Sequence, residues 1–115
     1  ANTQPEDVHR DIFSRSTYES GRASFQIGMW FLFRRPPTKV DTRAINCPVL
    51  VMGGAQDKIT PIAVQRKIAA MYPDNATLVE LTDACHWTIA DGHLTMVSQH
   101  MFDWLLNIEL TPTEQ

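Results

Sequence analysis

The sequence predicts an α/β fold in which two parallel strands, joined by a helix, are followed by a C-terminal helix. Three observations predict it. The continuous apolar run "PVLVMGG" at 48–54 is typical of a strand buried on both faces of a parallel sheet. A second short apolar run, "TLVEL" at 77–81, follows a segment long enough for a crossover helix. This strand, helix, strand order predicts a right-handed βαβ unit.

The first third of the chain predicts a polar lead-in and then one long helix. Residues 1–11 ("ANTQPEDVHRD") are polar and are expected to be frayed. A helix is expected over 17–33, and "RRPP" at 34–37 ends it, because proline lacks an amide donor and restricts the residue before it. The apolar positions of this helix recur along one side: Tyr18, Phe25, Met29 and Leu32.

The other two helices follow the predicted strands. Thr60 is predicted as the N-cap and Pro61 as the first residue of a helix that runs to about Tyr72, where "PDNA" ends it. A last amphipathic helix has Trp104 at its edge, and the end of the chain, 111–115, is expected to be flexible. The apolar face of this last helix is formed by Leu94, Val97, Met101 and Leu105.

Composition excludes several classes of function. The chain has 115 residues and a net charge of −3, and its longest basic run is Arg34-Arg35, so the electrostatic signature of nucleic-acid binding is missing. The apolar stretch "MWFLF" at 29–33 is too short to span a bilayer. Cys47 and Cys85 flank different ends of neighbouring strands about 17 to 20 Å long, too far apart for a disulfide. We therefore expect no nucleic acid, no membrane and a cytoplasmic location.

The predicted sheet brings an acid and a histidine to one edge. Asp57 follows the first strand and His86 follows the second, and parallel strands place both loops at the carboxyl edge, where open α/β sheets build their sites. An Asp that accepts from one imidazole nitrogen leaves the other nitrogen free to act as a base. The order of acid before histidine also fits the α/β-hydrolase order of Ser, Asp, His.

Together these segments resemble the C-terminal third of an α/β-hydrolase. The resemblance rests on "INCPVLVMGGAQDKITP" at 45–61, "AAMYPDNATLVEL" at 69–81, and "CHW" ahead of a helix that ends "FDWLL". It implies that Asp57 is the triad acid and His86 the catalytic base. Because "YESGRASFQIGMW" is similar to the end of a cap region, the implied domains are as follows: a helical cap end and connector at 1–42, a βαβα core at 43–110, and a tail at 111–115.

The nucleophile of such a triad is missing from the chain. No G-x-S-x-G motif occurs in the 115 residues, and none of the serines lies on a strand-to-helix turn between glycines. Two strands with an open edge are also marginal by themselves. We therefore expect a fragment or processed subunit that pairs with the missing N-terminal half or with itself as a homo-oligomer, and that is inactive in isolation.

Each candidate also has a simpler structural interpretation. Asp57 can cap the helix that begins near Thr60, and His86 can be a packed loop histidine. Cys85 is interpreted as a small buried hydrophobe rather than a nucleophile. The remaining acids and histidines match no zinc spacing, so neither a metal nor a cofactor is expected. Trp30 and Trp87 are candidates for the substrate pocket, and core packing is the alternative for the aromatic residues around Trp30.

Two functions remain open. In the first, the chain supplies Asp57 and His86 to a Ser-His-Asp triad that hydrolyses a small ester or related carbonyl substrate. In the second, it is a truncated, non-catalytic α/β interaction module that covers its open sheet edge by self-association.

Overall fold

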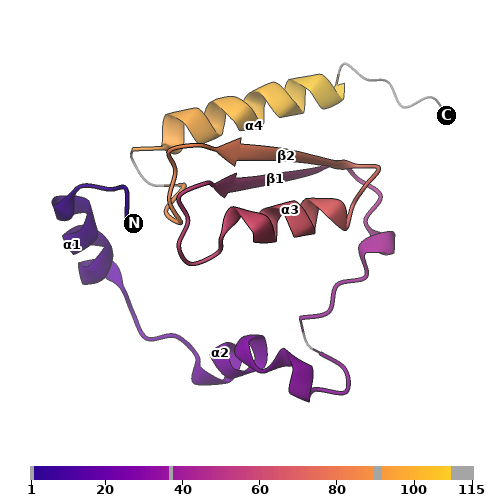
Figure 1. Cartoon of the computed structure of the whole chain (residues 1–115), viewed down its shortest axis with the longest axis horizontal. Coiled ribbons are helices and arrows are strands. Elements are labelled where there is room, and N and C mark those ends of the chain that lie inside the picture. Colours follow the sequence, from indigo (N-terminus) through magenta and orange to yellow (C-terminus); the bar gives the residue numbers. More distant parts are fainter. Residues whose placement is uncertain (1, 37, 90–91, 110–115) are drawn as a thin grey trace.

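A small parallel sheet lies between two helices in the computed structural model, which describes residues 2–36, 38–89 and 92–109. Strands β1 (Val49–Gly54) and β2 (Ala76–Leu81) pair in parallel, from Val49 opposite Ala76 to Gly54 opposite Leu81. Helix α3 (Ile62–Ala70) covers one face of the sheet and α4 (Leu94–Glu109) covers the other (Figure 1). The predicted α/β class, both strands and both helices are confirmed, with strand bounds within one residue of those predicted.

The start of α3 differs from the prediction. Its N-cap is Pro61 and its first residue is Ile62, so Thr60 is not the cap. The physical reason is that the Thr60 hydroxyl donates to the carboxylate of Asp57 instead, at 2.6 Å. The same oxygen lies 3.2 Å from His86 Nδ1, and no side-chain hydrogen bond caps the start of α3.

A small apolar core holds α4 against the sheet. Leu81, Ala84 and Val97 are buried together, and Met52 and Val79 pack against them. At the far end of β2, outside this core, the indole Nε1 of Trp104 donates to the hydroxyl of Thr77 at 3.2 Å. Of the apolar face predicted for the last helix, Val97 is buried in this core, whereas Leu94, Met101 and Leu105 remain about half exposed. The predicted tail, 111–115, lies outside the described residues.

Residues 1–11 are wrongly predicted as a frayed lead-in, since helix α1 spans Glu6–Arg15. Pro5 is its N-cap, and two acids occupy the first turn. Ion pairs one turn apart support it, Glu6 with Arg10 at 2.7 Å and Asp11 with Arg15 at 2.9 Å. These signals were present in the sequence, but the polarity of the segment concealed them.

The single helix predicted over 17–33 is also wrong. Helix α2 spans only Gly21–Gly28 and is followed by a 3₁₀ turn, η1 (Trp30–Leu32). Ser20 starts α2 by accepting from the amide of Ala23 at 3.3 Å, which breaks the expected helix at a residue that favours caps. The connector that follows contains a further 3₁₀ turn, η2 (Thr42–Ala44).

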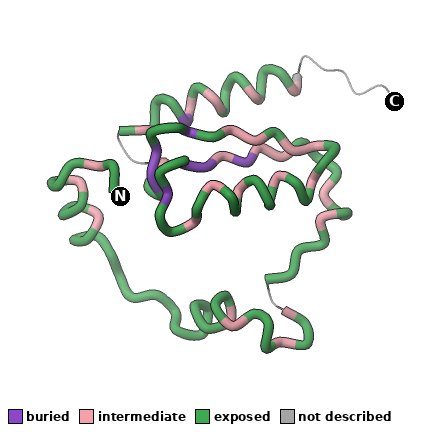
Figure 2. The backbone as a smooth tube through the Cα atoms, in the orientation of Figure 1, coloured by how far each residue is buried: buried purple, intermediate pink, exposed green. Residues whose placement is uncertain are grey.

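The chain exposes far more surface than a compact protein of its size. Its accessible surface is 9393 Å² at 13.0 kDa, against about 6300 Å² expected for a compact monomer. Burial is concentrated at the carboxyl ends of the strands and the loop after β2, while α1 and α2 are almost wholly exposed (Figure 2). In the described part of the chain, no helix combines the length and apolar character that crossing a membrane requires. Both cysteines are free, as expected.

Candidate active site

Backbone hydrogen bonds tie together the loops that follow β1 and β2. The amide of Ala55 donates to the carbonyl of Leu81 at 2.9 Å, and that of Gln56 donates to the carbonyl of Ala84 at 3.0 Å. Gly54 allows this approach, because a Cβ at that position would overlap the carbonyl oxygen of Ala84. None of the described glycines has a positive φ, so the need for glycine here is one of space rather than of turn conformation.

The carboxylate of Asp57 is almost fully satisfied by its own loop. Its Oδ1 accepts from the amides of Ile59 at 2.7 Å and Thr60 at 2.9 Å, and its Oδ2 accepts from the Thr60 hydroxyl. Burial raises the pKa of the Asp57 carboxyl, but hydrogen bonds from Thr60, His86 and Ile59 outweigh it and hold the pKa well below its usual range. Asp57 is therefore an ionised acceptor at neutral pH.

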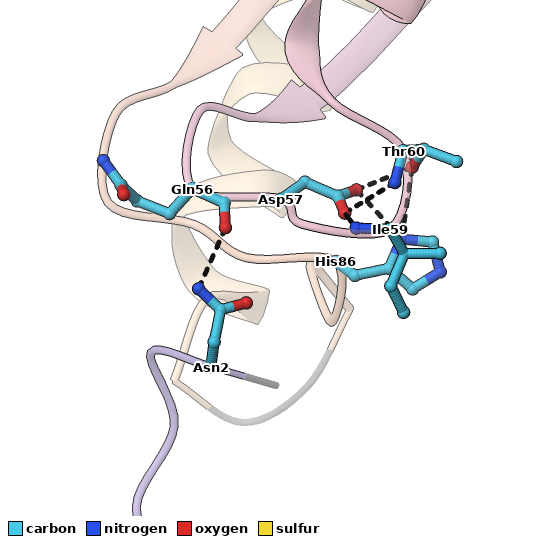
Figure 3. Close-up of polar contacts among 6 residues, drawn as sticks. All are labelled: Asn2, Gln56, Asp57, Ile59, Thr60 and His86. Carbon is cyan, nitrogen blue, oxygen red and sulfur yellow. Dashed lines mark hydrogen bonds and ion pairs between the residues drawn. The ribbon is translucent and has the colours of Figure 1, made fainter.

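His86 meets this carboxylate from the other loop. Its Nδ1 lies 2.9 Å from Asp57 Oδ2 (Figure 3). Because an ionised carboxylate can only accept, the Nδ1 of the neutral imidazole carries the proton and Nε2 keeps its lone pair. The side chain of Asp57 is 4% exposed and that of His86 is 40% exposed, so the acid is shielded while the imidazole remains accessible. The two residues predicted to meet at this edge do so.

We expect the contribution of Asp57 to the free energy of unfolding to be lost in acid. Because its folded pKa lies below its unfolded value, its contribution is complete above the unfolded pKa of about 4 and disappears as the pH falls from there towards the folded pKa. Urea unfolding of the wild type and Asp57→Asn should show a difference in free energy that is constant above about pH 5 and shrinks below about pH 4. A difference that stayed constant down to about pH 2 would contradict the lowered pKa of Asp57 in the folded state.

The two tryptophan candidates separate in the structure. Trp87 lines an open hollow of about 760 Å³ together with residues of α1, including Val8 and Ile12. Trp30 does not line it; Trp30 lies in η1, beside Phe31 in an edge-to-face contact at 6.4 Å, and is 53% exposed. Helix α2, which precedes η1, lies away from the sheet (Figure 1). Only Trp87 therefore stands beside the histidine, and the aromatic residues near Trp30 do not form a core.

The N-terminal segment contacts the site, which the sequence did not indicate. Asn2 Nδ2 donates to the carbonyl of Gln56 at 2.9 Å (Figure 3), and Thr3 hydrogen-bonds Cys85. Burial raises the pKa of the Cys85 thiol, but hydrogen bonds from Thr3 and Trp87 outweigh it and lower the pKa to about 7. Cys85 is completely buried, as predicted, so its sulfur has no access to a substrate.

The side chains that could ligate a metal ion do not gather in the described part of the chain. Among residues 2–36, 38–89 and 92–109, no three His, Cys, Asp or Glu side chains gather in a way that could hold a metal ion. His93 lies just before α4 and His100 lies within it.

Comparisons with known proteins identify the family. Residues 26–115 match the model of an α/β-hydrolase family (Abhydrolase_4) described as "TAP-like protein". No curated protein and no solved structure matches the chain significantly. The family match covers both strands, both loops and α4, and agrees with the resemblance that the sequence showed. The chain thus belongs to the TAP-like α/β-hydrolase family and corresponds to the C-terminal part of the α/β-hydrolase fold.

Proposed function

We propose that the chain provides the acid and the base of a Ser-His-Asp triad in a hydrolase that acts on small esters or related carbonyl compounds. The observation that carries the proposal is the 2.9 Å contact between Asp57 Oδ2 and His86 Nδ1 at the carboxyl ends of adjacent parallel strands. Membership of an α/β-hydrolase family supports a hydrolase, and the low pKa of Asp57 supports its role as a permanently charged partner.

In this function, His86 transfers a proton twice. Its Nε2 takes the proton of a nucleophilic hydroxyl as that oxygen attacks the substrate carbonyl, and Asp57 stabilises the imidazolium. The imidazolium then returns the proton to the leaving group as the carbon–leaving group bond breaks. Water repeats the sequence on the acyl-enzyme, which releases the acid and restores the hydroxyl. The accessibility of the imidazole supports this role, because the nucleophile has to approach Nε2.

The nucleophile comes from outside these 115 residues, since the chain has no G-x-S-x-G motif. We propose that the part carrying it docks along β1. This strand is a continuous apolar run that pairs only with β2 among the described residues, so its other edge is left unpaired by them. Beside β1 is an open apolar hollow of about 450 Å³, lined by Leu50, Met52, Thr88, Ile89, Val97, Met101, Trp104 and Leu105.

The same exposed surface favours a second candidate function. A strand edge and an apolar hollow left open by the described residues would also be covered by a second copy of the chain. In that case the chain is a non-catalytic module that forms a homo-oligomer, and Asp57 and His86 only hold the two loops together.

Intact mass spectrometry with a fluorophosphonate probe separates the two functions. The hydrolase predicts that a serine-bearing polypeptide, fused to this chain or co-purifying with it, takes the label, and that His86→Ala slows labelling by orders of magnitude. Equally fast labelling of His86→Ala would contradict the triad. A single unlabelled species of 13.0 kDa that light scattering shows to be a dimer or larger would support the module.

A further inference from the structure

Thr60 contacts both members of the acid–histidine pair. Its Oγ1 lies 2.6 Å from Asp57 Oδ2 and 3.2 Å from His86 Nδ1, so the three atoms form a closed triangle with the 2.9 Å contact between acid and imidazole (Figure 3). Its backbone amide also donates to Asp57 Oδ1. The side chain is partly buried and, among the contacts described, bonds only these two groups.

The hydroxyl has one proton, and its partners determine where that proton lies. Asp57 is an ionised acceptor, so the short contact to Oδ2 takes the Thr60 proton. Only lone pairs then remain to face His86 Nδ1. They can accept a proton on Nδ1, but they repel a bare nitrogen lone pair. The hydroxyl therefore penalises the tautomer in which Nδ1 is unprotonated, the one that cannot act as a base at Nε2.

We propose that Thr60 is a positioning residue that holds His86 in its Nδ1-protonated tautomer, with the Nδ1 proton shared between Asp57 and the threonine hydroxyl. This inference rests on the proposed function, because it assigns a purpose to the free Nε2. Thr60 touches neither substrate nor nucleophile and acts through its two partners.

A pair of substitutions isolates the hydroxyl. Thr60→Val keeps the β-branched shape and removes the oxygen, whereas Thr60→Ser keeps the oxygen and removes a methyl group. In the protein with its nucleophile-bearing part, Thr60→Val should lower kcat for a p-nitrophenyl ester roughly 10- to 100-fold with KM unchanged. Thr60→Ser, which keeps the hydroxyl, should retain a kcat close to that of the wild type. Thr82→Val, at an exposed threonine in the turn after β2, is the matched control and should leave kcat unchanged.

Nitrogen-15 NMR of the imidazole provides a readout that does not depend on activity. At a pH where His86 is neutral, the wild type and Thr60→Ser should show one tautomer, protonated at Nδ1, and Thr60→Val should show a mixture with the Nε2-protonated form. Thr60→Ala removes the same hydroxyl and replaces Thr60→Val if valine disturbs the fold.

The outcomes distinguish this inference from the proposed function. A wild-type tautomer and wild-type kcat in Thr60→Val would overturn the inference, as would a Thr60→Ser variant impaired as much as Thr60→Val. If Asp57→Asn leaves turnover intact, the proposed function fails. The tautomer measurement on Thr60→Val then still tests whether the Thr60 hydroxyl controls the proton on His86 Nδ1. If Asp57→Asn abolishes turnover and Thr60→Val does not change it, only the role of Thr60 fails.

Discussion

Replacing Asp57 with asparagine is expected to lower turnover by about 10⁴-fold while the protein stays folded. The carbonyl oxygen of asparagine can still accept from the amides of Ile59 and Thr60, so the loop keeps its shape. Its amide nitrogen, however, would face His86 Nδ1 as a donor. The imidazole would then carry its proton on Nε2, where it cannot take one from the nucleophile, and the imidazolium would lack a counter-charge.

The measurement is steady-state ester hydrolysis by the protein with its nucleophile-bearing part, with circular dichroism as the check on folding. Asp83→Asn is the matched control, because it makes the same charge change at an exposed acid in the loop that leads to His86. We expect its kcat to remain near that of the wild type. Turnover close to the wild-type value in a folded Asp57→Asn variant would contradict the assignment of the triad acid.

Replacing Gly54 with alanine is expected to separate the two loops that form the site. The added Cβ would overlap the carbonyl oxygen of Ala84 and lie 2.7 Å from that of Cys85. Both obstacles are backbone atoms, which cannot move aside as the end of a flexible side chain can. We expect a cost in the free energy of unfolding at or above the ~1–3 kcal/mol typical of overpacking, and a fall in kcat of about 100-fold or more from a displacement of His86.

Two other glycines provide graded controls for this prediction. At Gly53 the new Cβ would meet side-chain atoms of Gln65 and Ile62 and no backbone atom, so Gly53→Ala should be costly but less so than Gly54→Ala. At Gly21, in α2, nothing lies within 4 Å, and Gly21→Ala should be neutral or slightly stabilising. Urea unfolding and ester hydrolysis of the three variants test the order. Equal effects at Gly53 and Gly54 would show that backbone contact between the loops is not the limiting feature.

The parts of the fold that the sequence predicted well are those with a strong apolar pattern. The runs at 48–54 and 77–81 and Val97 of the last helix contribute to one small core, so burial and periodicity agree there. The sequence pattern did not indicate helix α1, because this helix is supported by acids in its first turn and by ion pairs one turn apart rather than by an apolar face in a core. Helix α2 was predicted too long because its aromatic residues recur at helical spacing while Ser20 and the glycines limit the helix.

Two residues of the candidate site, and the sheet edge at which they meet, could be predicted from the sequence. Parallel pairing places Asp57 and His86 at the same edge whatever the details of the loops. The contribution of Thr60 was not predictable, because it depends on where one hydroxyl lies to within about 0.5 Å. Nor did the polarity of residues 2–4 indicate that Asn2 and Thr3 would reach the two loops.

The sequence by itself determined the class of fold, the strand order and which acid and histidine, Asp57 and His86, meet at one sheet edge, since these follow from apolar periodicity and from the direction of parallel strands. Only the tertiary structure decided that Thr60 serves Asp57 and His86 rather than α3, that Gly54 is needed for the space beside Ala84, and that Trp87 rather than Trp30 stands beside the site. The physical reason is that hydrogen bonds and close contacts vary over tenths of an ångström between residues distant in the chain, whereas hydrophobic patterning is a property of neighbouring residues along it.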